Sequence, residues 1–322
     1  MGWLGLPLPK EYGGTSGSEL DMSLLVEELA RGLTAGALAY VVSLCFGGKS
    51  LHYFGSQEQK EEYLPKLARG EILFALGLTE ASGGSDVLSL TTRAVADGDD
   101  YVINGEKMFI TLAHEADFMI TVVRTGEPVP KKSYGLSLLI TDMKSIGITA
   151  ERLNQFGMRA SGINHIVLRD VRVPRSNLLG EADKGWYHLL HTLNNERITL
   201  GAMGVGLAQA AFDDALEYSK QRNAFGKPIG QLQTIQHRIA NMAAEIESAR
   251  WLVYRAAWLQ SQGRQCGYEA TMAKMVASEV AYRTASTGMH ILGGHGYLME
   301  QDMQRYFRDA RLGTFSPVSN DM

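Results

Sequence analysis

The spacing of apolar residues changes twice along this chain, and that change limits the folds available to it. In residues 18–67 apolar side chains recur three and four positions apart, the spacing of one helix face. Between about 72 and 174 they alternate and turn-forming residues separate the runs, whereas after Gly180 the helical spacing returns. We therefore predict an α+β chain with an N-terminal helical domain (1–71), a middle antiparallel β domain (72–176) and a C-terminal antiparallel four-helix bundle (177–322).

The middle region carries the signals of short strands joined by tight turns. Asp97-Gly98 and Asn104-Gly105 bracket residues 101–103, and both dipeptides tolerate the positive φ that hairpin turns require. The spacing predicts two successive hairpins here. Further strands are predicted where β-branched and apolar residues concentrate, at 118–123, 135–140 and 163–168.

The helical regions show recognisable boundaries. Ser56 is predicted to cap a helix that ends near Ala68. Small residues in 201–211 permit close helix packing, either within one chain or between subunits. The long C-terminal helices are predicted at 186–221, 232–262 and 268–292, with a shorter one at 301–311.

Composition excludes several classes of function. The 322 residues contain 31 Lys+Arg and 35 Asp+Glu, so the formal net charge of -4 argues against nucleic acid and anionic membranes as partners. The two cysteines, Cys45 and Cys266, are too few for a disulfide framework and favour a reducing compartment. Apolar runs are broken within about a dozen residues, short of a bilayer span, and no signal peptide is recognised.

Histidines do not form a convincing metal site. His188 and His191 share a helix face, but no third ligand is nearby in the sequence. We therefore predict no metal.

A glycine-rich stretch at 77–89 is the strongest chemical signal. It follows a predicted strand and holds the adjacent Gly83 and Gly84 together with hydroxyl and carboxylate side chains. Adjacent glycines let the backbone approach a ligand closely, and the N–H groups of such a loop can bind an anion. An isolated Gly-Gly pair is more often only a turn, so the context decides.

That context resembles the acyl-CoA dehydrogenase family. Residues 77–89 are similar, position by position, to the family's first signature. The second appears at 293–297 with Glu300, Arg305 and Asp309, and only His290 departs from it. The resemblance covers essentially the whole chain and implies that family members continue beyond it at both termini.

The resemblance implies an FAD site between the β domain and the bundle. Leu78 and Thr79 would face the pyrimidine edge of the flavin, Ser85 would reach the pyrophosphate, and the Thr111 hydroxyl would approach N5. The implied FAD-binding residues are Leu76, Leu78, Thr79, Gly84, Ser85, Phe109, Ile110, Thr111, Arg222, Phe225, Gln233, His290, Gly293, Gly294 and Ser319.

The segment 222–227 resembles the part of the family that reaches the FAD held by a neighbouring subunit. A planar guanidinium such as that of Arg222 can donate two parallel hydrogen bonds to a diphosphate. The resemblance therefore implies a homodimer or homotetramer. Taken alone, Arg222 would be a solvated charge at a helix end.

The catalytic base departs from the commonest family pattern. The usual glutamate position falls on Pro317, which has no peptide N–H to hold a thioester carbonyl. A minority of the family carries the glutamate on a bundle helix before an arginine, which here is Glu196. The alternative is an exposed helix glutamate paired with Arg197 or Lys184. The resemblance further implies substrate contacts from Ser85, Asn194 and Arg197.

The resemblance implies an FAD-dependent acyl-CoA dehydrogenase of β-oxidation that desaturates an acyl thioester and passes electrons to an electron-transfer flavoprotein. Same-fold alternatives are an enoyl-thioester reductase, a dehydrogenase of carrier-protein-bound acyl groups and a flavin monooxygenase. A flavin-binding protein without turnover is disfavoured, because no basic cluster suits DNA. The expected location is the cytoplasm, or the mitochondrial matrix if a transit peptide precedes Met1.

Overall fold

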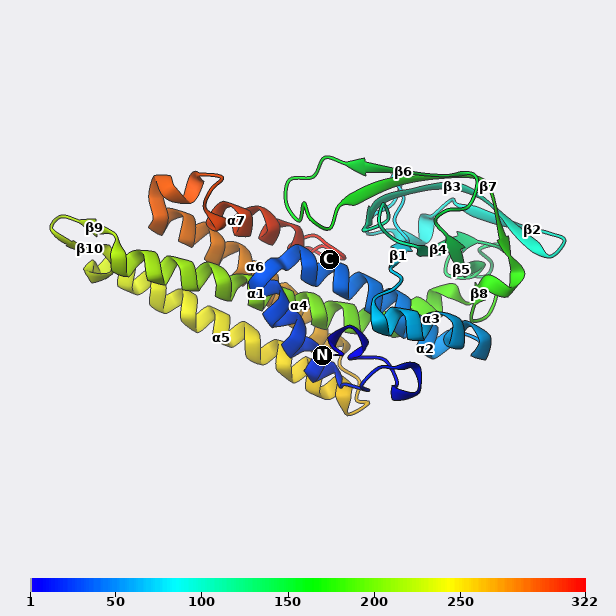
Figure 1. Cartoon of the computed structure of the whole chain (residues 1–322), viewed down its shortest axis with the longest axis horizontal. Helices are drawn as coiled ribbons and strands as arrows, with labels where there is room; N and C mark the ends of the chain where they lie inside the picture. Colours follow the sequence, from blue (N-terminus) through cyan, green and yellow to red (C-terminus); the bar gives the residue numbers. More distant parts are fainter. Residues whose placement is uncertain (1) are drawn as a thin grey trace. The chain divides into compact units, whose positions relative to one another are not determined.

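The computed structural model describes residues 2–322, which divide into two units. The first unit comprises residues up to Ser18, Ala39–Gln155 and Ser161–Leu193, and holds the β-sheet. The second comprises Glu19–Leu38, Phe156–Ala160 and Asn194–Met322, and is almost wholly helical. Figure 1 shows the order of the elements along the chain.

One eight-stranded sheet organises the first unit, within the described residues. Its strand order is β6-β7-β3-β2-β4-β5-β8, and β1 pairs with β4. Most pairs are antiparallel, as the alternating pattern predicts, but β1 and β4 run parallel, so the sheet is mixed. The strands are β1 (Phe74–Gly77), β2 (Arg93–Asp97), β3 (Asp100–Thr111), β4 (Phe118–Arg124), β5 (Leu136–Asp142), β6 (Ile148–Leu153), β7 (Ile163–Pro174) and β8 (Leu178–Leu179).

Burial follows the sequence pattern of each strand. β4 and β5 are buried along most of their length, as their continuous apolar runs predict. β7 alternates buried and half-buried residues over its first half, as expected for a strand with one covered face. The core of the unit forms where Ile103, Met119 and Ile166 meet, each fully buried.

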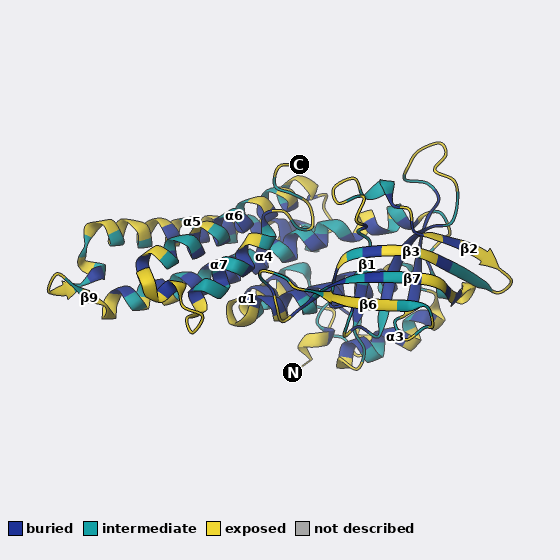
Figure 2. Ribbon diagram, turned by 90° about the horizontal axis from the view of Figure 1, so that it is seen from above, coloured by how far each residue is buried: buried dark blue, intermediate teal, exposed yellow. Residues whose placement is uncertain are grey.

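Only one of the two predicted hairpin turns is a turn. Gly98 has φ +59° and closes the β2–β3 hairpin, whose exposed tip is visible in Figure 2. Asn104 and Gly105 instead lie inside β3, where the register against β7 shifts. Gly105 has φ +151°, and a Cβ there would lie 2.5 Å from the Thr92 hydroxyl oxygen. The prediction of a second hairpin is therefore wrong, because a glycine required by a β-bulge gives the same local signal as a turn.

The helix predicted to be capped by Ser56 is present in the first unit. α3 (Gln57–Arg69) is capped by Ser56, whose hydroxyl accepts the Gln59 N–H at 3.2 Å, while the Gln59 side chain accepts the Ser56 N–H. This capping box confirms the predicted N-cap. α2 (Lys49–Phe54) follows a buried π-helical segment, Val42–Gly48.

Long helices make up the second unit. They include the first part of α1 (Glu19–Val41), most of α4 (Gly185–Gln221), α5 (Gln233–Ser261), α6 (Gly267–Leu292) and α7 (Asp302–Gly313). The boundaries predicted for α4, α5, α6 and α7 agree with the observed ones within two residues. α5 packs against α6, and α6 packs against α7. Figure 2 shows exposed residues recurring along α5.

The small residues of α4 serve packing within the chain. A Cβ on Gly206 would lie 2.1 Å from the Glu27 carbonyl oxygen of α1, and one on Gly204 would lie 2.9 Å from the Ala277 carbonyl oxygen of α6. Both approaches need glycine, because any side chain would force the backbones apart. The stripe at 201–211 therefore joins α4 to two helices of its own unit.

One helical stretch, Glu19–Phe54, is long and apolar enough to cross a membrane by length and composition. Within its most apolar window 67% of the residues are buried in the structure, as in a core helix. The apolar runs of the sequence are short, but the helix continues through the glycine and polar positions that separate them.

Candidate active site

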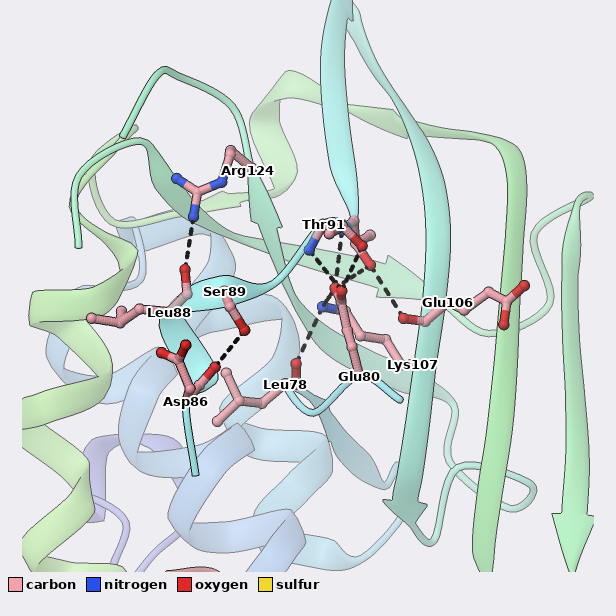
Figure 3. A network of polar contacts seen from close by, with 10 residues as sticks. Leu78, Glu80, Asp86, Leu88, Ser89, Thr91, Glu106, Lys107 and Arg124 are labelled. Carbon is pink, nitrogen blue, oxygen red and sulfur yellow. Dashed lines mark hydrogen bonds and ion pairs between the residues drawn. The ribbon is translucent and has the colours of Figure 1, made fainter. Parts of the chain in front are cut away.

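A buried ion pair holds the glycine-rich loop against the sheet (Figure 3). The Lys107 ammonium donates to the Glu80 carboxylate at 2.8 Å and to the Leu78 carbonyl oxygen at 3.2 Å. Thr91 and Thr92 each donate a peptide N–H and a hydroxyl to the same carboxylate, at 2.6 to 3.0 Å. The Lys107 side chain is fully buried, so the charges are satisfied only by these partners.

Electrostatics keeps this pair ionised at neutral pH. Burial opposes ionisation of Glu80, but the Lys107 charge and the hydrogen bonds from Lys107, Thr92 and Thr91 outweigh it and lower the pKa of Glu80 to about 2. Burial lowers the pKa of Lys107 to about 8, although the Glu80 charge opposes that shift. The loop is therefore anchored by a complete charge pair.

The predicted flavin-contacting residues of the β domain lie on β1, on this loop and on β3. The Met108 N–H donates to the Thr79 carbonyl oxygen at 2.8 Å, which brings the loop and β3 together. Phe109 has φ +60° and is 59% exposed, an unusual combination for an aromatic residue in a strand. Thr111 ends β3 and is half-buried. Leu76 lies in β1. Ile110, the residue between Phe109 and Thr111 in the sequence, is buried.

The end of the loop is open to solvent. Gly84 and Ser85 are exposed, and a Cβ on Gly84 would meet nothing within 4 Å. Such a backbone can be approached closely by a ligand, and Ser85 adds a hydroxyl. These features suit a phosphate-bearing ligand, as the sequence predicts.

Glu196 is buried in α4, contrary to the alternative of an exposed surface pair. Its residue exposure is 8%, and within residues 2–322 its carboxyl group has no hydrogen-bond donor and no cationic partner within 4 Å. Burial raises the pKa of Glu196 to about 8, and the charges of Arg197 and Lys274 offset this only in part. Lys184 pairs instead with Glu181. A buried carboxyl group with a raised pKa is typical of a general base or acid.

A buried lysine, Lys274, lies close enough to Glu196 for the two charges to affect each other. The Lys274 ammonium donates to the Val318 carbonyl oxygen at 2.6 Å and to the Asn320 side-chain oxygen at 2.8 Å. Burial lowers the pKa of Lys274 to about 8, and the charges of Glu196 and Glu279 oppose that shift. Lys274 therefore connects the surroundings of Glu196 to the C-terminal segment.

The C-terminal segment contains Pro317, which stands at the usual position of the catalytic glutamate, and Ser319, a predicted FAD contact. Pro317 is exposed and offers no N–H, as expected. Ser319 is half-buried, and its hydroxyl donates to Asp321 at 3.1 Å. On α4, Arg197 donates to the Asn194 side-chain oxygen at 3.3 Å, so the two predicted substrate contacts of the bundle are adjacent.

The predicted pyrophosphate contacts lie at and after the end of α4. Arg222 is exposed and precedes the hairpin of β9 (Asn223–Ala224) and β10 (Lys227–Pro228). Phe225, at its tip, is 91% exposed with φ +53°. Gln233 is the exposed first residue of α5.

The second glycine-rich segment follows α6. Gly293 and Gly294 are exposed, and a Cβ on either would meet nothing within 4 Å. His290 is exposed, and its Nδ1 lies 2.9 Å from the Ser286 carbonyl oxygen. The ring centroids of His295 and Tyr218 are 6.0 Å apart, which places this segment beside the C-terminal part of α4.

Sequence reasoning missed the lysines of both sites. Lys107 and Lys274 are buried, but a lysine in a single sequence is normally interpreted as a solvated charge. The rings of His188 and His191 both lie against the Phe54 ring, tilted at 4.4 Å and edge-on at 5.6 Å between centroids. Among the described residues no cluster of three metal-ligating side chains occurs.

Comparisons with known proteins identify the class of this fold. Family models of the acyl-CoA dehydrogenase N-terminal, middle and C-terminal domains match residues 1–71, 75–171 and 183–316. The probable acyl-CoA dehydrogenase YngJ of Bacillus subtilis is 42% identical over 313 residues, which cover 97% of this chain and 82% of that protein. The chain belongs to the acyl-CoA dehydrogenase family.

Two further relatives inform the chemistry. The caffeyl-CoA reductase–Etf complex subunit CarC of Acetobacterium woodii is 36% identical over 316 residues, covering 98% of this chain and 83% of that protein. The crystal structure of an acyl-CoA dehydrogenase complexed with FAD from Bacillus anthracis superposes with a TM-score of 0.92 at 32% identity, covering 99% of this chain and 57% of that one. This chain is accordingly a flavin-dependent oxidoreductase, and its cofactor is FAD.

The residues present fit that cofactor. The peptide N–H groups of Leu78 and Thr79 donate to no other group of residues 2–322, so both are free to bind an acceptor edge. The exposed Phe109 ring offers an apolar face nearby along β3, and Gly84 leaves room for a phosphate. A planar heterocycle joined to a diphosphate needs this set of donors and surfaces.

Proposed function

We propose that this protein desaturates an acyl-CoA thioester between its α and β carbons, with Glu196 as the base. The buried carboxyl group of Glu196, without a hydrogen-bonding partner in the described chain, is the observation that carries the proposal. FAD, when bound, supplies the acceptor for the hydride that leaves the β carbon. Glu196 takes the α proton, and the product is a trans-2-enoyl thioester.

The surroundings of Glu196 suit this proton transfer. A carboxyl group with a pKa of about 8 is a stronger base once ionised than an ordinary glutamate, which suits a weakly acidic α carbon. The positive charges of Arg197 and Lys274 favour its ionised form. We propose that Asn194, Arg197 and Ser85 contact the substrate. The thioester carbonyl must be held without a peptide N–H from residue 317.

We also propose the remaining predicted cofactor contacts as functional. Thr111, Phe109 and Ile110 would face the flavin, while Arg222, Phe225 and Gln233 would serve the FAD of a second copy of the chain in a homodimer or homotetramer. His290, Gly293, Gly294 and Ser319 complete the proposed set. We propose the divisions at residues 71 and 176 as its domain boundaries.

An electron-transfer flavoprotein is the proposed electron acceptor. The name of the Acetobacterium relative includes an Etf complex, which supports this partner. The same name describes a reductase, so the second candidate function is reduction of an enoyl-CoA by the same site. Relatives from bacteria support a cytoplasmic location for the protein.

Replacing the proposed base separates catalysis from cofactor binding. We expect Glu196→Gln to retain FAD and to slow reduction of the flavin by saturated acyl-CoA at least about 100-fold, because the base is lost while the side-chain shape is kept. Rapid mixing without oxygen measures this rate. Glu217→Gln, an exposed glutamate of the same helix, is the control and should react like the wild type. An unimpaired Glu196→Gln enzyme would refute the assignment.

A further inference from the structure

The Lys107–Glu80 ion pair is buried and surrounded by a dense set of hydrogen bonds. Glu80 accepts hydrogen bonds from Lys107, Thr91 and Thr92, and the Lys107 side chain has no exposed surface. Figure 3 shows Lys107 from β3 and Thr91 from the segment before β2 converging on the Glu80 carboxylate of the loop. Such a network holds its members in one arrangement, because moving any of them leaves a buried polar group without a partner.

The hydrogen bond from Lys107 to the Leu78 carbonyl also fixes the direction of the Thr79 N–H, which belongs to the same peptide unit. The carbonyl of Leu78 points at the Lys107 ammonium, 3.2 Å away. In a planar trans peptide the C=O and the following N–H point in opposite directions, so the Thr79 N–H points away from Lys107. That N–H donates to no group of the described chain. The adjacent Thr79 carbonyl is occupied by the Met108 N–H at 2.8 Å, which prevents the segment from turning over.

The direction of this donor matters for a flavin. Reduction places negative charge on the pyrimidine edge of the ring, and a fixed N–H donor stabilises developing charge at no cost of reorganisation. Thr79 is half-buried, so its N–H acts where water screens it incompletely.

We propose that Lys107, held in place by Glu80, is a positioning residue for the flavin: by binding the Leu78 carbonyl it aims the Thr79 N–H at the acceptor edge of the cofactor. The pair thereby contributes to FAD affinity and raises the midpoint potential of the bound flavin. This inference rests on the proposed function only in taking the loop as a flavin contact.

Three proteins test the proposal, each as the full chain reconstituted with FAD. Lys107→Met removes the anchor, and Glu80→Gln/Lys107→Met also removes the charge left unpaired. Lys144→Met, whose side chain is 81% exposed, is the control. The readouts are thermal unfolding of the apoprotein, the FAD dissociation constant and the midpoint potential.

The double variant distinguishes positioning from a structural role. We expect Lys107→Met to lower the unfolding temperature and to weaken FAD binding by about tenfold or more, with a more negative potential. In the double variant the unfolding temperature should recover because no buried charge is unpaired, while FAD binding and potential stay impaired. Recovery of all three together would overturn the proposal, as would unchanged FAD binding in a folded Lys107→Met protein.

A measurement on the wild type keeps the proposal testable if the variants fail to fold. Hydrogen exchange of the Thr79 amide should be fast in the apoprotein and slowed at least about tenfold by FAD, because only the cofactor supplies its acceptor. Equal exchange with and without FAD would overturn the proposal. A wild-type protein that binds no FAD at all would instead refute the proposed function.

Discussion

Glu196 makes folding stability depend on pH in a direction opposite to that of most carboxylates. Its folded pKa is raised by burial to about 8, above the ordinary value of 4.5. A group with a raised folded pKa contributes stability that is complete below its unfolded pKa and is lost as pH rises through the folded pKa. The window of loss therefore runs from about pH 4.5 to about pH 8.

Glu196→Gln should accordingly stabilise the folded protein at alkaline pH. We expect equal stability of wild type and variant near pH 4.5, and a difference in the variant's favour that grows by up to about 1.4 kcal/mol per pH unit toward pH 8. Urea unfolding at several pH values measures it. A constant difference across this range would show that the carboxyl group does not titrate abnormally.

The residue scale also shows what a single sequence conceals. The resemblance predicts Glu196 as the base from its place before Arg197, but its burial could not be predicted, because a glutamate in a helix is usually exposed. The Glu80–Lys107 contact joins positions 27 apart in the chain, so no local pattern specifies it. Lys274 was missed for the same reason: its partners lie 44 and 46 positions away.

At the scale of single elements, the helix and strand positions were predicted well because their signals are local. Apolar spacing located α4, α5 and α6 within one residue at each end, and Ser56 marked the start of α3. The hairpin predicted at Asn104-Gly105 was wrong, because the role of Gly105 depends on its close approach to Thr92, the residue just before β2. The parallel pairing of β1 with β4 was likewise not predictable from alternation alone.

The cap of α3 offers a test at this scale. Ser56→Ala removes the acceptor for the Gln59 N–H and should destabilise the protein by about 1 kcal/mol, read from urea unfolding. Ser248→Ala is a matched control, because that exposed hydroxyl only donates within α5 to the Ala244 carbonyl. Loss of stability in the control but not in Ser56→Ala would contradict the assignment of the cap.

At the scale of the whole molecule, the order of helical, β and helical regions was predictable from the change of apolar spacing, and the family models match along that order. Function could be predicted as far as the family because two long glycine-rich signatures survive in the chain. The acyl chain length that the protein accepts could not be predicted from the sequence, because it depends on side chains that come together from distant segments.

The most direct test of the account is anaerobic mixing of the FAD-loaded protein with a series of saturated acyl-CoAs, following the absorption band of oxidised flavin. We predict that the band bleaches with at least one of them and that the matching enoyl-CoA is formed, as the proposed role of Glu196 as the base requires. A flavin that stays oxidised with every saturated acyl-CoA, while enoyl-CoA reoxidises the reduced protein, would contradict dehydrogenation and establish the reductase direction.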